Sequence, residues 1–331
     1  MNSTSQDFVA TSALRTPSSA PPVDVSVLVP AKDEAENLPL FMEEAAKAFA
    51  GSPFKYEVIV VDDGSEDATW SVLQRLTNQY SFLRLARHRS RRGIADALRT
   101  GYLHAQGKVL VFYPADMQFK PEDIPRLVAP ILGDEADMVT GFKQGKYEKA
   151  FVSGIYNALS RTLFKVPVKD LNSVKAYRRE IMDALPIRPD WHRYMIVIAA
   201  AQGFTVTEIP VPLYPRHAGK SKFGLSRIPV GVLDMLAVWF ELRFGKKPLL
   251  LFGMAGFAMF AVSVIAGVYL LATGAGIRSL WALIETCLIL GSILFATGLL
   301  GEQIAGQRAE VRELRRQLDE LRSDSESRHS P

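Results

Sequence analysis

The chain has 331 residues, of which 48% are hydrophobic and 22% are charged, and its formal net charge is +4. This excess is too small to indicate a nucleic-acid-binding protein, and it fits a protein that faces anionic lipid or phosphorylated substrates. Cys287 is the only cysteine, so a single chain can form neither a disulfide framework nor a cysteine-based zinc site.

The first part of the chain alternates between strand-like and helix-like segments. Residues 1–22 are rich in Ser, Thr, Ala and Pro without the apolar core of a signal peptide, which predicts a disordered tail. Apolar runs predict strands at residues 25–29, 56–61, 82–86, 108–113, 138–142 and 205–214, and helix-like stretches cover 37–50, 68–79 and 93–105. This alternation predicts an α/β domain with a mainly parallel sheet that is covered on both faces.

Polar and acidic clusters follow three of the predicted strands. They are Pro30-Ala-Lys-Asp-Glu34, Asp62-Asp63-Gly64-Ser65 and Pro114-Ala-Asp116-Met-Gln118. Ligands of mainly parallel sheets bind at the carboxyl ends of the strands, so these clusters mark the expected site. No GxGxxG follows the first strand, which disfavours a dinucleotide-binding fold.

Two apolar runs late in the chain are each long enough to cross a bilayer. Residues 248–277 contain no charge before the turn and residues 279–301 contain one, Glu285, whereas a spanning helix needs about 20 apolar residues. Residues 248–301 are therefore predicted to be a hairpin of two transmembrane helices. Basic residues flank its outer ends, namely Arg243, Lys246, Lys247, Arg308, Arg312, Arg315 and Arg316, against Arg278 alone in the turn. The positive-inside rule then predicts a multi-pass protein of the cytoplasmic (inner) membrane, with both termini and the α/β domain on the cytoplasmic side.

The segments on either side of the hairpin have helical periodicity. Residues 225–247 read either as a core helix or, because they lead directly into the first span, as an amphipathic helix in the membrane interface. In the charged tail 302–331, an a/d pattern is formed by Ile304, Val311, Leu314, Leu318 and Leu321. This pattern is short, and both a solvated helix and a homo-oligomer contact fit it.

The most specific motif is Tyr214-Pro-Arg216-His-Ala-Gly219-Lys220-Ser221-Lys222-Phe-Gly224, a Gly-containing loop whose cations and hydroxyl can wrap a diphosphate. Four further segments accompany it and the strand-end clusters. They are Met138-Val-Thr-Gly-Phe-Lys143, Lys149-Ala-Phe-Val-Ser153, Lys169-Asp170-Leu-Asn-Ser173-Val-Lys175 and Trp191-His192-Arg193-Tyr194.

In their order, their spacing and the hairpin that follows, these motifs resemble the inverting family-two glycosyltransferases that charge a polyprenyl phosphate with a sugar. Dolichol-phosphate mannosyltransferase and the bacterial undecaprenyl-phosphate glycosyltransferases are the type members. The resemblance covers about residues 25–224, and it implies a GT-A nucleotide-sugar-binding domain over residues 23–224.

The resemblance also implies roles for individual residues. Donor binding would fall to Pro30, Ala31, Asp33, Glu34, Asp62, Asp63, Ala115, Asp116, Gln118, His192, Arg216, Lys220, Ser221 and Lys222. The expected catalytic residues are Asp116, Asp170, Arg216 and Lys222, and the expected ligands of the acceptor phosphate are Lys143, Lys149 and Ser153. Competing structural interpretations are a helix cap for Asp170, a packed core imidazole for His192 and a solvated basic patch for Lys149.

A Mg²⁺ or Mn²⁺ ion is expected on Asp116 and Gln118, because a hard cation disperses the charge that builds on a leaving diphosphate. The family commonly has a second carboxylate where this chain has Pro114, so the usual two-carboxylate pattern is incomplete.

The sequence therefore favours transfer of a sugar from a UDP- or GDP-sugar to a polyprenyl phosphate at the membrane. Two alternatives stay open: a glycosyltransferase of the same fold with another acceptor, and a membrane-anchored nucleotide-sugar sensor or scaffold. Pro114 and the heptad-like tail are the reasons to consider the second.

Overall fold

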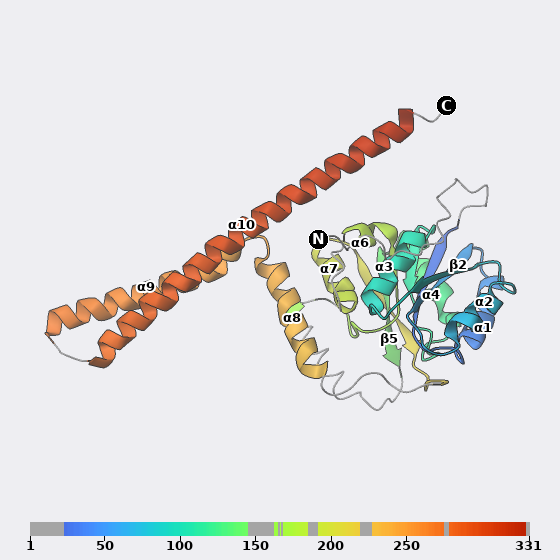
Figure 1. Ribbon diagram of the computed structural model, residues 1–331, viewed down its shortest axis with the longest axis horizontal. Coiled ribbons are helices and arrows are strands. Elements are labelled where there is room, and N and C mark those ends of the chain that lie inside the picture. Colours follow the sequence, from blue (N-terminus) through green and yellow to red (C-terminus); the bar gives the residue numbers. More distant parts are fainter. Residues whose placement is uncertain are drawn as a thin grey trace, which may run out of the picture. The chain divides into compact units, whose positions relative to one another are not determined.

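A seven-stranded sheet in the order β3-β2-β1-β4-β6-β5-β7 forms the centre of the first compact unit, Met1–Met235, of the computed structural model (Figure 1). The structure describes residues 23–144, 162–164, 166, 168–184, 191–218, 227–274 and 278–328. The strands are β1 Val25–Ala31, β2 Tyr56–Asp63, β3 Leu83–His88, β4 Val109–Phe112, β5 Met138–Gln144, β6 Lys175–Arg178 and β7 Val206–Pro212. All pairings are parallel except those of β6, which runs antiparallel to both β4 and β5. The prediction of a mainly parallel sheet is thus confirmed.

Helices cover the sheet on both faces (Figure 1). They are α1 Leu38–Ala50, α2 Thr69–Leu76, α3 Ile94–His104, α4 Ile124–Leu132, α6 Arg179–Ala184 and α7 Met195–Ala201, with 3-10 turns η1 Pro121–Asp123 and η2 Trp191–Tyr194. α1 contacts α2 and α4, whereas α3 contacts β1 and β2. Val27 and Phe41 belong to the core cluster beneath α1, and Leu28 faces the other way, towards Gly101 of α3. Since a Cβ on residue 101 would lie 3.2 Å from Leu28 Cδ2, the glycine allows α3 to approach the sheet closely.

The second compact unit, Leu236–Pro331, contains the two apolar helices. α8 Arg227–Phe244 crosses the division between the units, and it is followed by α9 Pro248–Thr273 and α10 Arg278–Arg328. By length and composition, α9 and the first part of α10 can each span a membrane. The predicted hairpin is confirmed, since α9 and α10 pack along each other, and α10 continues without a break to residue 328 (Figure 1).

Glycines set the distance between the two helices of the hairpin. A Cβ on Gly256 of α9 would lie 2.7 Å from the carbonyl oxygen of Gly291 on α10, and a Cβ on Gly291 would lie 3.0 Å from the Gly256 oxygen. The Leu249 N–H at the start of α9 also donates to the Glu302 Oε2 of α10, over 3.3 Å. Small residues at such crossings let backbones approach closely, which increases the van der Waals packing that helps helices to associate in lipid.

We expect Gly256→Leu to destabilise the hairpin, because the new side chain has no room against the Gly291 backbone. Overpacking of this kind costs about 1–3 kcal/mol. The matched control is Gly267→Leu on the same helix, where an added Cβ meets nothing within 4 Å. Thermal stability of the detergent-solubilised protein, followed by size exclusion, measures the difference. Equal midpoints for the two variants would contradict the role of the glycine contact.

Candidate functional site

The strand register brings the predicted clusters to one edge of the sheet. Ala31 at the end of β1 pairs with Asp62 of β2, and Asp63 pairs with His88 at the end of β3. β5 and β7 end at the same edge. β6 runs the other way, so it begins at that edge with Lys175 opposite Phe112 of β4. The turn that precedes β6 therefore joins the loops that follow the other strands.

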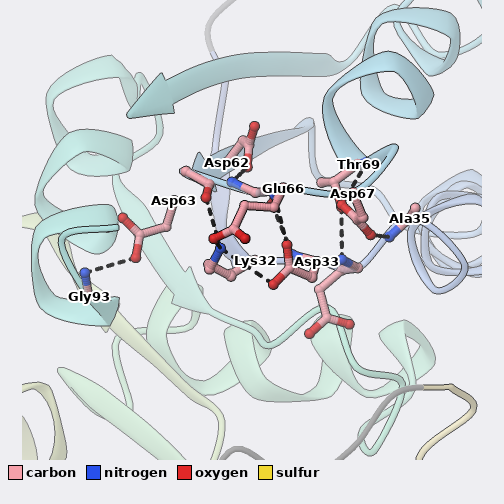
Figure 2. A network of polar contacts seen from close by, with 12 residues as sticks. Lys32, Asp33, Ala35, Asp62, Asp63, Glu66, Asp67, Thr69 and Gly93 are labelled. Atoms are coloured by element: carbon pink, nitrogen blue, oxygen red, sulfur yellow. Dashed lines mark hydrogen bonds and ion pairs between the residues drawn. The ribbon is translucent and has the colours of Figure 1, made fainter. Parts of the chain in front are cut away.

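The loops after β1 and β2 are tied together by hydrogen bonds (Figure 2). The Asp33 N–H donates to Ser65 Oγ over 2.9 Å, and the Glu66 N–H donates back to Asp33 Oδ1 over 2.9 Å. Lys32 Nζ donates to the Gly64 carbonyl oxygen over 2.8 Å. Asp33 has a φ of +52°, a left-handed conformation that a non-glycine residue adopts only when its surroundings impose it. The carboxylate of Asp33 thus organises the loop.

The remaining residues predicted in the first loop lie at this edge. Pro30 and Ala31 are the last two residues of β1. The Glu34 N–H donates to Thr69 Oγ1 over 2.8 Å, and its carboxylate accepts a hydrogen bond from Asn37 Nδ2 over 2.6 Å. These contacts fix the first turn of the loop against the start of α2.

Asp62 and Asp63 have different surroundings. Both oxygens of Asp63 are taken up: Oδ1 contacts His88 Nδ1 at 2.7 Å and the Arg92 N–H at 2.8 Å, and Oδ2 accepts from the Gly93 N–H over 2.8 Å. Asp63 therefore holds the start of α3. Asp62 is fully buried and accepts from the Ser65 N–H through Oδ1. Its Oδ2 lies 3.0 Å from Arg87 Nε without hydrogen-bond geometry and has no hydrogen-bond partner in the described part of the chain.

Asp116 follows β4 and faces the loop after β7. Its Oδ2 lies 2.9 Å from Arg216 Nη2, and its Oδ1 accepts from the Gln118 N–H over 3.2 Å. Burial raises the pKa of Asp116, and the Arg216 guanidinium opposes that shift. Met117, between Asp116 and Gln118, has a φ of +57°, and Ala115 is buried. The Tyr214 N–H donates to the Gln118 carbonyl oxygen over 2.9 Å, which fixes the β7 loop onto the Asp116 turn.

A second charged group lies at the turn before β6. Lys143 Nζ, from β5, lies 3.3 Å from Asp170 Oδ2 and donates to the Asn172 carbonyl oxygen over 2.7 Å. Asp170 Oδ1 accepts from the Asn172 N–H, so this carboxylate shapes the turn as well as pairing with Lys143. Asp170 is 4% exposed, and Lys143 contributes electrostatically to the pKa of Asp116. The structure thus places the predicted residues Asp116, Lys143 and Asp170 in one charged region.

Lys175 lies beneath this region and is fully buried. Its Nζ donates to the carbonyl oxygens of Leu171, over 3.1 Å, and His192, over 3.3 Å, so it joins the Asp170 turn to η2. Burial lowers the pKa of Lys175 to about 7, with Asp170 opposing the shift. Burial also lowers the pKa of His192 to about 3, so this imidazole is neutral, and its Nδ1 has no hydrogen-bond partner in the described residues.

Some predicted site residues lie in segments that the structure does not describe, and some residues at the site were not predicted. Lys149, Ser153, Lys220, Ser221 and Lys222 fall in segments that the structure does not describe, so their roles stay predictions. Lys175, Arg87 and His88 were not predicted as site residues. The largely basic segment Arg87-His-Arg-Ser-Arg-Arg92, directly after a predicted strand, is the signal that could have identified the last two.

The protein side chains at this edge could hold a divalent cation only if the substrate supplies further metal ligands. Among the described residues no group of three or more His, Cys, Asp or Glu side chains could hold a metal ion. Asp116 is a buried carboxylate that accepts a hydrogen bond from the backbone N–H of Gln118, and Mg²⁺ commonly binds to one or two carboxylates plus substrate phosphates. The Asp116 carboxylate therefore fits a cation that arrives with a diphosphate.

The mixed, mostly parallel seven-stranded sheet has the GT-A fold. Glucosyl-3-phosphoglycerate synthase from Mycobacterium tuberculosis, solved with Mn²⁺, UDP and glucosyl-3-phosphoglycerate, has this fold. It superposes with a TM-score of 0.53 and 20% identity over 66% of this chain and 80% of that one. Residues 26–176 match the family described as "Glycosyl transferase family 2". The chain is therefore an enzyme with a family 2 glycosyltransferase domain.

Two relatives are similar over nearly their full lengths. A dodecaprenyl-phosphate galacturonate synthase from Rhizobium johnstonii is 28% identical over 298 residues, which cover 86% of this chain and 88% of the relative. An undecaprenyl-phosphate 4-deoxy-4-formamido-L-arabinose transferase from Pseudomonas fluorescens is 29% identical over 304 residues, which cover 87% of this chain and 86% of the relative. The similarity thus extends beyond the family 2 domain into the apolar helices.

The buried amine of Lys175 should make stability depend on pH. In the unfolded chain its pKa is the usual 10.5, and in the folded protein it is about 7. Between these values the unfolded chain binds more protons, so Lys175 makes the free energy of unfolding rise with pH. Lys175→Met should flatten the rise in melting temperature between pH 7 and pH 9.5, and Lys55→Met, at an exposed position, should not. Parallel curves for wild type and Lys175→Met would contradict a buried, titrating Lys175.

Proposed function

We propose that the protein transfers one sugar from a nucleotide-sugar to a polyprenyl phosphate at the cytoplasmic face of the membrane, with inversion at the anomeric carbon. The observation that carries this proposal is the meeting of Asp116, Arg216, Lys143 and Asp170 at one sheet edge, in a chain that also has two membrane-length helices. Both named relatives are polyprenyl-phosphate sugar transferases or synthases that align with the helices as well as the domain.

The nucleotide would bind across the ends of β1 and β2. Asp62 Oδ2 is a buried acceptor that forms an ion pair with Arg87 but accepts no hydrogen bond in the described part of the chain, and such a group suits the N–H of a base or a ribose hydroxyl. Asp63 would support this position by accepting hydrogen bonds from the Arg92 and Gly93 N–H groups at the start of α3. Arg216, together with residues 220–222, would contact the diphosphate, since charge-assisted contacts to phosphate are strong.

Asp116 and Gln118 would hold Mg²⁺ or Mn²⁺ together with the donor diphosphate. The ion would supply Lewis-acid stabilisation of the leaving phosphate. Arg216 now pairs with Asp116 Oδ2, so the diphosphate has to draw Arg216 to itself before Asp116 can serve the ion fully. Arg216 would then neutralise charge on the leaving group in its own right.

In the transfer, an oxygen of the acceptor phosphate attacks the anomeric carbon, and the bond from that carbon to the diphosphate oxygen breaks. The nucleoside diphosphate leaves with the bonding electron pair, and no proton has to be removed because the acceptor is already an anion. The site must mainly position two anions. Lys143 would bind the acceptor phosphate, and Asp170, 3.3 Å from Lys143 Nζ, would orient that amine.

The acceptor would reach the site from the bilayer. Lys149 and Ser153 would join Lys143 in binding its phosphate. α8 exposes the apolar side chains of Val230, Leu233 and Leu236, which supports a helix in the membrane interface. The excess of basic residues outside the hairpin supports the cytoplasmic placement of the domain.

Purified protein should form an organic-extractable sugar lipid from undecaprenyl phosphate and one member of a UDP- and GDP-sugar panel, in the presence of Mn²⁺ or Mg²⁺. Undecaprenol, which lacks the phosphate, is the matched negative acceptor. A soluble acceptor such as 3-phosphoglycerate tests the alternative hypothesis, in which an enzyme of the same fold transfers the sugar to an acceptor other than a lipid. Transfer to the soluble compound in preference to undecaprenyl phosphate would reject the lipid acceptor.

The metal assignment gives a further prediction. Asp116→Asn should abolish Mn²⁺ binding in the presence of UDP and lower kcat/KM by at least about 100-fold, because it removes the charged oxygen ligand.

Arg216→Gln should lower kcat/KM by about 10- to 100-fold, since one charge-assisted contact is worth about 1.5–3 kcal/mol. The same variant should bind Mn²⁺ more tightly than wild type without UDP, because Asp116 loses its partner.

Calorimetry or Mn²⁺ electron paramagnetic resonance measures these affinities directly. Arg126→Gln, which removes another Arg–Asp pair of the same domain, is the control and should change neither affinity nor rate. Normal Mn²⁺ binding by Asp116→Asn would overturn the metal assignment.

A further inference from the structure

The part of α10 beyond the hairpin exposes a row of large apolar side chains. α10 is one continuous helix of 51 residues, and within the hairpin it buries Cys287, Gly291 and Gly298 against α9. After residue 301 the composition changes to charged, yet four apolar side chains are about half exposed. They are Ile304 at 50%, Val311 at 49%, Leu314 at 52% and Leu318 at 58%.

These residues share one face of the helix. With Ile304 at a heptad position a, Val311 and Leu318 also fall at a, and Leu314 and Leu321 fall at d. The residues buried against α9 fall at b and e of the same frame, so the row is a different face from the one that packs on α9. A helix with charged residues on its other sides and an apolar a/d row is typical of a coiled-coil strand, since that row needs a partner to leave water.

The charges beside the row favour a parallel partner with the same sequence. Positions e hold Arg308, Arg315 and Arg322, and the g positions of two heptads hold Glu310 and Gln317. In a parallel pair, g of one strand meets e of the next heptad of its partner, so Glu310 meets Arg315 and Gln317 meets Arg322. An antiparallel pair would instead bring arginines at e against each other.

The hairpin adds an independent constraint on direction. Two copies held in one membrane by α9 and α10 present their α10 tails in the same direction, which is the direction that the charge pattern favours. β-branched Ile304 and Val311 at a, with Leu314 at d, favour two strands over three or four. Gln307 occupies the one polar d position between them, which opposes a shift in register.

We propose that residues 304–321 of α10 form a parallel, two-stranded coiled coil with α10 of a second copy of this chain. Each copy contributes the same apolar row, so the contact is isologous and closes as a dimer. This proposal concerns assembly, and its outcome is independent of which sugar or acceptor the enzyme uses.

Disulfide crosslinking in phospholipid nanodiscs tests the proposal on the full chain. In a Cys287→Ala background, Leu314→Cys places a thiol at d, where the two strands of a parallel dimer bring the same residue together. Arg316→Cys, two residues away at the outward f position, is the matched control. Mild oxidation should crosslink most of the Leu314→Cys protein and little of the Arg316→Cys protein. Equal or absent crosslinking in both would overturn the proposal.

A charge exchange separates this contact from other routes to a dimer. Glu310→Arg should reduce the dimer fraction by light scattering, and Glu310→Arg with Arg315→Glu should restore it. Leu314→Glu should give monomer that retains the nucleotide binding of the wild type, which shows that the domain is still folded. A dimer that survives Leu314→Glu unchanged, or a wild type that is monomeric with its tail lying on the lipid surface, would overturn the proposal.

Discussion

The reversed direction of β6 is the constraint on which the candidate site depends. β1, β2, β3, β4, β5 and β7 share one direction, so the loops that follow them leave at the same edge, and a seventh strand parallel to them would begin at the opposite edge. Because β6 is antiparallel, the turn that contains Asp170 precedes it at the shared edge. Without this reversal Asp170 could not reach Lys143 on the neighbouring β5.

Electrostatics explains why the edge is built from paired charges. Asp116 and Asp170 are almost completely buried, and a buried carboxylate is stable only with a nearby cation or several donors. Arg216 and Lys143 supply those cations in this structure. The same cations are suited to anionic substrates, so in the proposed function ligand binding would exchange one set of partners for another. On that proposal, the pairs would satisfy the buried carboxylates until a phosphate group binds.

Lys175 supports this arrangement from below. Its amine satisfies two carbonyl groups in a region that excludes water, and the cost of burying it appears as a lowered pKa. A neutral amine at moderately alkaline pH still donates both hydrogen bonds. The turn and η2 therefore remain joined whichever protonation state Lys175 adopts, while the net charge beneath Asp170 changes.

Hydrophobic runs made much of the fold predictable. β1 and β2 are almost entirely buried, so their sequences are continuous apolar segments that end at the predicted clusters. β6 was not predicted, because it begins with Lys175 and ends with Arg178 and has no such run. α4 was missed because Pro125 and Pro130 lie within its nine residues, although Pro125 is at the first turn, where proline is tolerated. α7 is apolar on all sides, so its sequence has no helical periodicity.

The site could be predicted only as far as single motifs reach. The order of the strand-end clusters located Asp62 and Asp116, because those residues follow recognisable strands. Asp63 holds the start of α3 through two backbone N–H groups. This contact depends on the pairing of Asp63 with His88 on the neighbouring strand, which no local sequence pattern encodes. The contact between Asp116 and Arg216 joins residues 100 positions apart in the chain and likewise required the fold.

Exposed apolar residues at heptad positions a and d occur in both parts of α10, but their surroundings differ between the hairpin and the charged tail. Within the hairpin, Ile293 and Leu300 are exposed apolar side chains that need no protein partner if lipid surrounds them. Past residue 301 the same a/d register continues through Ile304 and Val311 among charged neighbours, where lipid no longer accounts for it. Because α10 is continuous, the a and d positions of the hairpin part and of the charged tail lie on the same face of the helix. Two hairpins that associate through their tails would therefore also have their spanning helices brought to a defined separation, and the domains attached to them would act as a pair.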